Sequence, residues 1–224
     1  MIETHNTGFS FQVLAQSNRI FWFLYVKLDV SSHKPDRYTD ADAENLAQLY
    51  LDKPITATLL FRNLWENRIR VKLTNLEEGV QERWHKGRLV LVGDAAHKMT
   101  SNLAFGFNTG FESAASLTNH LIRAHGADGE HLRSPSLAIL ELAFEKYQEQ
   151  MFGRAKLFHD LTNLYTRIAA WDNLLFQWLS ICVMKLLPNS VFVGQFSRLV
   201  KGGVKLDFVP VSNERCGTVP FDNE

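Results

Sequence analysis

The residues between positions 88 and 121 are the part of this chain best suited to bind a cofactor. An apolar run at 89–92 ends in Gly93 and Asp94, and a polar turn then leads to a helical pattern that opens near Asn108. A carboxylate accepts hydrogen bonds from ligand hydroxyls, and the free N–H groups of a helix N-terminus stabilise negative charge. The segment therefore predicts a site for a polyhydroxylated, partly anionic ligand.

Four residues of this segment are candidates for direct contact. Gly93 lacks a Cβ, so that backbone and ligand can approach closely. Asp94 follows a strand, and the carboxyl ends of strands are where α/β folds place ligands. The alternative for this pair is a turn that Gly93 permits and Asp94 caps. His97 and Lys98 are candidate catalytic residues near cofactor or substrate, and a solvated turn is the alternative for them.

Composition restricts the class of protein. The chain has 224 residues, 46% of them hydrophobic, which is enough for one sizeable core. Lys+Arg and Asp+Glu both number 24, so the chain has no basic excess, and we expect no nucleic-acid partner. The 2 cysteines and the absence of a signal-peptide pattern predict a cytoplasmic protein. The 8 histidines show no metal-ligand spacing, and we expect no metal site.

Hydrophobic periodicity predicts short strands and helices in an α/β (α+β) arrangement. Residues 8–15 and 20–28 predict an antiparallel hairpin with a turn at 16–18 and a more buried second strand. The run at 88–92 has no polar position after Arg88, which predicts a strand covered on both faces. The other expected elements are a helix from a Thr39 capping box to about residue 51, a helix at 57–68, a strand at 68–73, a helix at 108–125 with Phe111, Ala114, Ala115, Thr118, Leu121 and Ile122 toward the core, a long helix capped by Ser134 and Pro135 with a break near Gly153, and a helix at 174–187. The last is shorter than the roughly 20 residues of a membrane span, so we expect a packed or interfacial helix and peripheral membrane contact through the C-terminal helices.

The candidate segment resembles the second flavin-binding segment of FAD-dependent monooxygenases of the aromatic-hydroxylase type. It looks closest to the fungal subgroup that epoxidises or hydroxylates terpenoid and meroterpenoid intermediates of secondary metabolism. The residues that carry the resemblance are Gly93-Asp94-Ala95-Ala96-His97-Lys98-Met99-Thr100, Asn102-Leu103, Gly106, Asn108, Glu112 and Ala114-Ala115. Further similar segments lie upstream at 19–23, 37–39, 64–68 and 76–79 with Trp84, and downstream at 166–167, 170–173, 206–210 and 219–221. Most of the chain is therefore covered.

The resemblance implies a partial flavin-monooxygenase fold with a small mixed sheet and a helical C-terminal half. It implies three segments: 1–87 as substrate-side sheet and helices, 88–125 as the flavin-binding strand, turn and helix, and 134–224 as a C-terminal helical region. FAD would be the cofactor, NAD(P)H the transient reductant, and an apolar terpenoid, meroterpenoid or polyketide the substrate. Asp94 would bind the ribityl chain, and backbone N–H groups from Gly106 through Phe107 to Asn108 would meet the ring edge.

The chain also departs from the family. Its sequence has no Gly-x-Gly-x-x-Gly for the ADP moiety, which the family carries in its N-terminal part. The resemblance is thus to the C-terminal half, and a separate N-terminal partner chain is an expected partner. The family's Pro, Gly-Gln and Asp are replaced by Ser101, Ala104-Phe105 and Ser113, and Phe107 replaces a small residue. The two phenyl groups either stack on a ring or fill its space. The alternative function is a flavin-free relative: a binding or partner protein, or a cofactor-free isomerase or cyclase.

Overall fold

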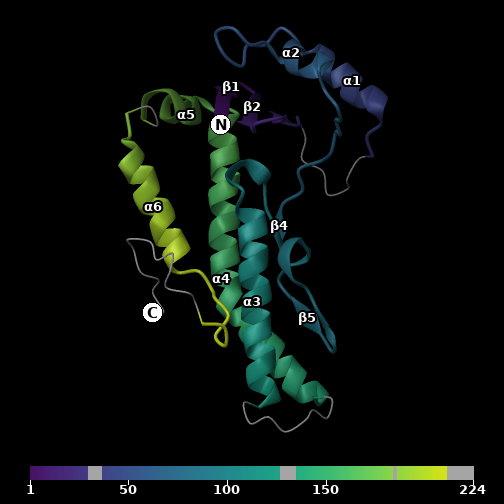
Figure 1. Cartoon of the computed structure of the whole chain (residues 1–224), viewed down its shortest axis with the longest axis vertical. Coiled ribbons are helices and arrows are strands. Elements are labelled where there is room, and N and C mark those ends of the chain that lie inside the picture. The colour runs from purple at the N-terminus through teal and green to yellow at the C-terminus, as the bar shows by residue number, and fades with distance from the viewer. Residues whose placement is uncertain (30–36, 127–134, 184–185, 211–224) are drawn as a thin grey trace. The chain divides into compact units, whose positions relative to one another are not determined.

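The computed structural model describes residues 1–29, 37–126, 135–183 and 186–210. It divides into two compact units: Met1–Glu77 with Leu164–Lys185, and Glu78–Asn163 with Leu186–Glu224 (Figure 1). Helices and small sheets occur together, which confirms the predicted α/β class. The expected mixed sheet is not found, because every strand pair of the described residues is antiparallel. The three-segment division by role stays a prediction.

The first unit is built on a three-stranded sheet of β1 (Ile2–Asn6), β2 (Phe9–Ala15) and β3 (Ile20–Val26), in that order. The predicted hairpin is confirmed, and its turn is closed by a 2.9 Å hydrogen bond from the Gln16 amide to the Arg19 carbonyl. The prediction of a more buried second strand was wrong. β2 is the more buried strand because it lies between two neighbours, whereas β3 forms an edge.

The helices of the first unit begin with α1 (Asp40–Gln48), whose predicted capping box is confirmed. The Thr39 amide donates to the Asp42 carboxylate at 2.7 Å, and the Asp42 amide donates to the Thr39 hydroxyl at 3.3 Å. The helix expected at 57–68 is shorter, α2 (Phe61–Glu66). The strand expected at 68–73 is absent, and Ile69 is almost fully exposed. Residues 68–73 alternate in polarity but pair with no strand of the described residues. Of the alternating apolar residues, Val71 and Leu73 pack onto the core and Ile69 does not.

The C-terminal part of this unit holds α5 (Leu174–Trp178) and a π-helix (Leu179–Val183). The Asn173 side chain caps α5 by accepting from the Phe176 amide at 2.9 Å. This region was expected as one α-helix, of which 184 and 185 lie outside the described residues. The Gly8 amide donates to the Ala170 carbonyl at 2.8 Å and joins this region to the sheet.

The second unit contains α3 (Phe105–His125) alongside residues 137–163 of the long α4 (Leu137–Ala169), with α6 (Asn189–Lys201) packed on them (Figure 1). The last residues of α4 belong to the first unit. α4 runs through Gly153 without the expected break. Its first turn is capped by Ser136, whose hydroxyl accepts from the Ile139 amide at 3.3 Å. Ser134, the expected cap, lies outside the described residues.

Four very short strands complete the second unit. β4 (Gly79–Val80) pairs with β7 (His97–Lys98), and β5 (His85–Lys86) pairs with β6 (Leu89–Val90). β6 is the strand predicted to be covered on both faces, and that prediction was wrong because Leu89 is exposed. A tight turn at Gly87, with φ of +59°, folds β6 back onto β5, so the apolar run ends in a hairpin.

The buried face of α3 also differs from the prediction. Phe111, Ala114 and Ile122, expected in the core, are exposed. The residues that α3 buries are instead Phe105, Thr109, Ser113, Ser116 and Asn119. The predicted helix is therefore confirmed, but the prediction of its buried face was wrong. Polar partners on the neighbouring elements decide which face of α3 turns inward.

Candidate functional site

The Asp94 carboxylate is presented by a short 3-10 turn, Gly93–Ala95, that follows β6. Gly93 has a φ of +61°, a conformation that glycine adopts without the penalty of a side chain. The Ala96 amide closes the turn on the Gly93 carbonyl at 2.9 Å. Asp94 is exposed, and among the described residues none hydrogen-bonds its carboxylate. The carboxylate is therefore open to hydroxyl donors from a ligand.

Glycines bring this turn against the first turns of α3. A Cβ added to Gly93 would lie 3.7 Å from the Gly110 Cα, and one added to Gly110 would lie 3.7 Å from the Gly93 Cα. A Cβ on Gly106 would lie 3.8 Å from Asp94 Oδ1. The structure thus brings Gly93, Asp94 and Gly106 together, and a side chain at Gly106 would project toward the carboxylate.

The N-terminus of α3 lies beside the same carboxylate. The helix starts at Phe105 after Ala104, which has a left-handed conformation with φ of 56° and supplies no side-chain cap. The N–H groups of the first three helical residues, Phe105, Gly106 and Phe107, have no acceptor within the helix. The Asn108 side chain turns back and donates to the Ala104 carbonyl at 3.1 Å. Positive partial charge therefore gathers next to Asp94.

The two phenyl groups of the helix start point in different directions. Phe105 is buried and packs on Phe158 and Phe196, with ring centroids 4.7 and 5.6 Å apart. Phe107 is 74% exposed, and its ring meets that of Phe111 edge-on, with centroids 4.6 Å apart. One ring belongs to the core and the other to the surface, so they do not jointly fill the space at the turn.

His97 lies behind the turn and is completely buried. Its Nε2 is 2.7 Å from the Ser113 hydroxyl of α3, and its ring is 5.4 Å from that of Trp84. Burial lowers the pKa of His97, and the charge of Asp94 opposes this shift. A neutral, enclosed imidazole supports the contact between β7 and α3. Lys98 is partly exposed and lies opposite Gly79 in the β4–β7 ladder.

Tyr147 of α4 closes the rear of the same cluster. Its hydroxyl donates to the Leu91 carbonyl at 3.2 Å, and its ring is 5.4 Å from that of Trp84. Burial raises the pKa of Tyr147 to about 12. The cluster therefore consists of neutral groups at neutral pH, and Asp94 is the charged group that the turn presents to solvent.

Sequence reasoning missed one ion pair that holds α3 in place. Arg154 of α4 donates two hydrogen bonds to the Glu112 carboxylate of α3, one from Nε to Oε2 and one of 2.8 Å from Nη2 to Oε1. The same guanidinium donates to the Leu199 carbonyl of α6 at 2.7 Å and lies 4.7 Å above the Phe158 ring. In the sequence, Glu112 stands out only as part of the motif. No local signal connects it to Arg154, 42 positions later.

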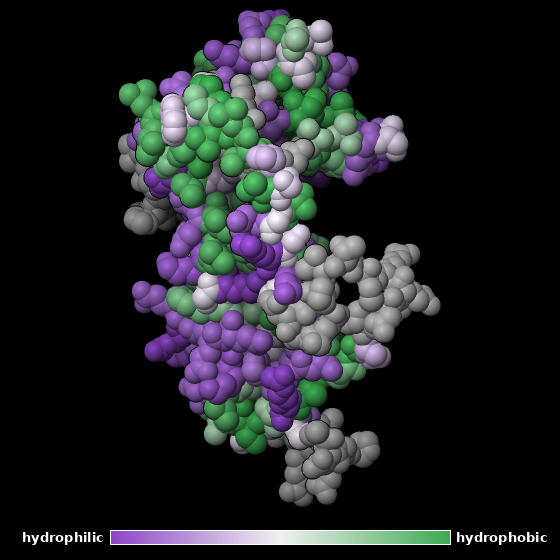
Figure 2. Space-filling model, turned by 90° about the vertical axis from the view of Figure 1, so that its left-hand side faces the viewer, coloured by the Kyte–Doolittle hydropathy of each residue, from purple (hydrophilic) through white to green (hydrophobic). Residues whose placement is uncertain are grey.

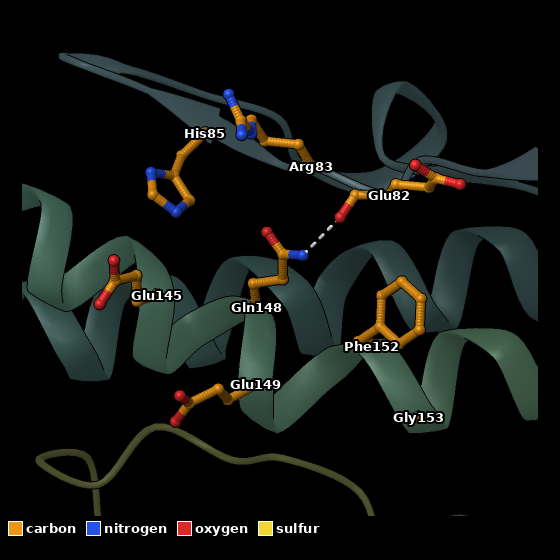
Figure 3. A pocket seen from close by; sticks show the side chains of 8 residues that line it. All are labelled: Glu82, Arg83, His85, Glu145, Gln148, Glu149, Phe152 and Gly153. Atoms are coloured by element: carbon orange, nitrogen blue, oxygen red, sulfur yellow. Dashed lines mark hydrogen bonds between the residues drawn. The ribbon is translucent and has the colours of Figure 1, made fainter.

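A separate pocket of about 520 Å³ lies between α4 and the segment that leads into β5 (Figure 3). In it the Gln148 amide donates to the Glu82 carbonyl at 2.8 Å, and its oxygen accepts from the Trp84 amide at 2.9 Å. The lining residues are Glu82, Arg83, His85, Glu145, Gln148, Glu149, Phe152 and Gly153. None of them belongs to the predicted site.

Comparison with known proteins settles the family. The family model described as FAD binding domain matches residues 1–134, more than half of the chain. The chain belongs to the FAD-binding-domain family. It is 34% identical to the FAD-dependent monooxygenase esdpE of Penicillium shearii, over 92% of this chain and 43% of that protein. It is 37% identical to the FAD-dependent monooxygenase DEP2 of Alternaria brassicicola, over 95% of this chain and 41% of that protein.

The chain is thus a relative of fungal FAD-dependent monooxygenases, and it spans less than half the length of these curated relatives. Among solved structures, RebC-10x soaked with chromopyrrolic acid is 21% identical, over 84% of this chain and 31% of that one, with a TM-score of 0.44. The rebeccamycin biosynthetic enzyme RebC with reduced flavin is 29% identical, over 46% and 17%, with a TM-score of 0.35. The predicted family is confirmed, while the C-terminal half and the terpenoid subgroup stay predictions.

Proposed function

We propose that this chain forms the ribityl and ring side of an FAD-dependent monooxygenase of fungal secondary metabolism. The observation that carries the proposal is the open carboxylate of Asp94, held beside Gly106 at the uncapped start of α3. We propose that the chain corresponds to the C-terminal half of the family and that the substrate is an apolar terpenoid, meroterpenoid or polyketide. Bound FAD, reduced by NAD(P)H, would supply the oxygen-transfer chemistry.

The residues of the turn have separate tasks in this proposal. Asp94 accepts hydrogen bonds from the ribityl hydroxyls, as an exposed carboxylate to which no described residue hydrogen-bonds can. Gly93 lets the turn lie close to Gly110 of α3, and Gly106 keeps a side chain away from the Asp94 carboxylate. The N–H groups at the start of α3 face the electron-rich edge of the ring, and the helix dipole stabilises the negative charge of the reduced ring.

The structure supports this fit in two ways. The cluster of His97, Ser113 and Tyr147 behind the turn is buried and fixes β7 against α3. The Glu112–Arg154 pair fixes α3 against α4 and α6. The carboxylate and the helix start therefore lie on packed elements, which is what a preorganised binding site needs.

FAD binding to the chain tests the proposal. FAD fluorescence is titrated with the wild-type protein, with Asp94→Asn, and with Asp52→Asn as the control for an exposed carboxylate elsewhere. Loss of a charge-assisted hydrogen bond costs about 1.5–3 kcal/mol, so we expect Asp94→Asn to weaken FAD binding about tenfold or more. The control should stay within about twofold of wild type. Absence of FAD binding by the wild-type chain refutes the proposal.

The flavin-free alternative rests on one observation, the presence of Phe105 and Phe107 where the resembling motif has smaller or polar residues. In that case the chain is a binding or partner protein, or a cofactor-free isomerase or cyclase. Conversion of an apolar candidate substrate without FAD, oxygen or nicotinamide selects the cofactor-free enzyme. Binding of that substrate without conversion selects the binding role.

Peripheral membrane contact through the C-terminal helices is a further proposal. α5 and the π-helix expose Leu174, Leu175, Trp178 and Ile181, and Figure 2 shows hydrophobic residues gathered at the level of α5. Such a short apolar face can lie in a membrane interface. Flotation with anionic vesicles tests it, and a chain that stays unbound contradicts it. Within the described residues, no helix is both long and apolar enough to cross a membrane.

A further inference from the structure

Four polar side chains from three distant parts of the sequence meet inside the first unit. Glu3 and His5 lie on β1, Tyr165 lies near the end of α4, and Ser180 lies in the π-helix. Figure 1 shows β1, the end of α4, and α5, which leads into the π-helix, side by side. Glu3 and His5 are two positions apart on a strand, so their side chains project from the same face of the sheet. We call these four residues the Ser180 cluster.

The contact between Ser180 and His5 is a short hydrogen bond. Ser180 Oγ lies 2.7 Å from His5 Nδ1. Hydroxyl groups inside helices often donate to the carbonyl four residues earlier, as Thr109 does to Phe105 in α3. The Ser180 hydroxyl instead meets a ring nitrogen 175 positions away, from a π-helix, a rare form that is frequent at functional sites. An imidazole in this position is a base that can take the hydroxyl proton.

Glu3 determines which ring nitrogen of His5 is the base. His5 Nε2 lies 3.8 Å from Glu3 Oε1, and an ionised carboxylate can only accept a hydrogen bond. The hydrogen of the neutral ring therefore lies on Nε2, and Nδ1 accepts from Ser180. Glu3 Oε1 is buried and has no hydrogen-bond partner among the described residues, so it is available to this N–H. Contacts between catalytic groups are often long until a substrate binds.

Tyr165 holds the other oxygen of Glu3. Its hydroxyl donates to Glu3 Oε2 at 2.7 Å. Burial raises the pKa of Tyr165, and the hydrogen bond to Glu3 raises it further, so the hydroxyl keeps its proton at neutral pH. The side chains of Glu3 and His5 are 14% and 17% exposed, and Ser180 is 7% exposed. The cluster is therefore held in place and largely enclosed, but it is not sealed from solvent.

We propose that Ser180 is a nucleophile for acyl transfer, with His5 as its general base and Glu3 as the acid that orients His5. A serine hydroxyl on one nitrogen of an imidazole, with a carboxylate at the other, is the arrangement that this chemistry needs. Tyr165 is a positioning residue that acts through Glu3. The substrate class is an ester with an apolar acyl chain, because Trp178 and Ile181 flank Ser180 and expose apolar side chains. This activity needs no flavin and goes beyond the proposed function.

The reaction balances without a cofactor. Ser180 Oγ attacks the ester carbonyl carbon, and its proton passes to His5 Nδ1. The bond from the carbonyl carbon to the alcohol oxygen then breaks, and the alcohol leaves with the proton from His5. Water attacks the acyl-serine next and gives a proton to His5, which returns it to the Ser180 oxygen as the acid is released. The ester is hydrolysed, and nothing is oxidised or reduced.

The full chain is treated with a fluorophosphonate probe, which bonds covalently to activated serines. Mass spectrometry of peptides from the labelled wild-type protein should find the probe on Ser180. Hydrolysis of p-nitrophenyl butyrate, an ester with a short apolar acyl chain, should be lost in Ser180→Ala. His5→Gln should slow labelling and hydrolysis at least about a hundredfold, the usual contribution of a general base.

Ser116→Ala is the matched control. Ser116 is also a buried helical serine, but its hydroxyl donates to the Gln150 side-chain oxygen, which is not a base. This variant should leave labelling and hydrolysis unchanged, and thermal melting should show that all the variants fold. Three results overturn the proposal: wild-type protein that stays unlabelled, a probe on another residue, or labelling and hydrolysis that His5→Gln leaves intact. A cluster that only fastens the π-helix to the sheet would give the first result. No flavin enters these assays, so this proposal and the proposed function can fail separately.

Discussion

Substitution of Ala104 by glycine should stabilise the protein. Ala104 precedes α3 in a left-handed conformation, with φ of 56° and ψ of 25°. In an L-residue with a Cβ this conformation costs roughly 1–2 kcal/mol, and glycine adopts it freely. Glycine also gives the unfolded chain more freedom, which offsets about 0.4–1 kcal/mol of the gain. We therefore expect Ala104→Gly to raise the free energy of unfolding by about 0.5–1 kcal/mol.

The control makes the same alanine-to-glycine change at a position inside α3. Ala114 is exposed in α3, so Ala114→Gly leaves no cavity and should cost about 0.5–1 kcal/mol of helix propensity. Urea unfolding, followed by circular dichroism at roughly 222 nm, measures the free energy of unfolding of both variants. Opposite signs are expected. If both variants lose stability to the same extent, the left-handed conformation assigned to Ala104 is wrong, and with it the way in which α3 begins.

Three further predictions concern the groups that hold α3 and its neighbours. Arg154→Ala leaves the Glu112 carboxylate without its partner and should lower the free energy of unfolding in urea by about 2–3 kcal/mol. This loss is smaller than for a fully buried pair, because the two side chains are 15% and 17% exposed. The surface control Lys146→Ala should cost less than about 0.5 kcal/mol, and equal losses would contradict the anchoring role. The pKa of His97 is lower in the folded than in the unfolded protein, where it is the ordinary histidine value of 6.5. The unfolded state therefore binds more protons below pH 6.5, and the free energy of unfolding should fall as the pH is lowered from that value. His97→Gln should flatten this acid slope of Tm against pH, and an unchanged slope would exclude His97 as its source. The pKa of Tyr147 is raised to about 12 from 10.0, so stability should fall as pH rises between these values. Tyr147→Phe should lessen that alkaline loss, and an undiminished loss would mean that Tyr147 does not cause it.

Local signals predicted the elements whose causes are local. The hairpin of β2 and β3 follows from alternation on either side of a polar turn. The start of α1 follows from the reciprocal hydrogen bonds of Thr39 and Asp42, which are three positions apart. The existence of α3 follows from its period. In each case the interacting residues are close in sequence, so the pattern contains the reason for the structure.

Elements that depend on distant partners were predicted less well. Residues 68–73 alternate like a strand but have no neighbouring strand, so they stay irregular. The apolar run at 88–92 folds back at Gly87 instead of entering a larger sheet. The inward face of α3 is set by Gln150, Lys205 and other groups far along the chain. No window of sequence contains these partners.

The candidate site was predicted from its motif, and the structure adds the contacts that the motif cannot contain. Motif reasoning named Gly93, Asp94 and Gly106, and the structure brings them together through the approach of Gly93 to Gly110. It did not predict that His97 would be enclosed behind the turn. The binding roles of these residues stay predictions that ligand experiments have to test.

The central claim is that Asp94 holds the ribityl chain of a flavin. Riboflavin has that chain and lumichrome, the bare ring system, lacks it, so the two ligands separate ribityl contacts from ring contacts. Both are titrated by fluorescence into the wild-type protein and Asp94→Asn. We predict that Asp94→Asn weakens riboflavin binding about tenfold, as expected for one charge-assisted hydrogen bond, and leaves lumichrome binding within about twofold. Equal losses for the two ligands, or no loss for riboflavin, would contradict the claim.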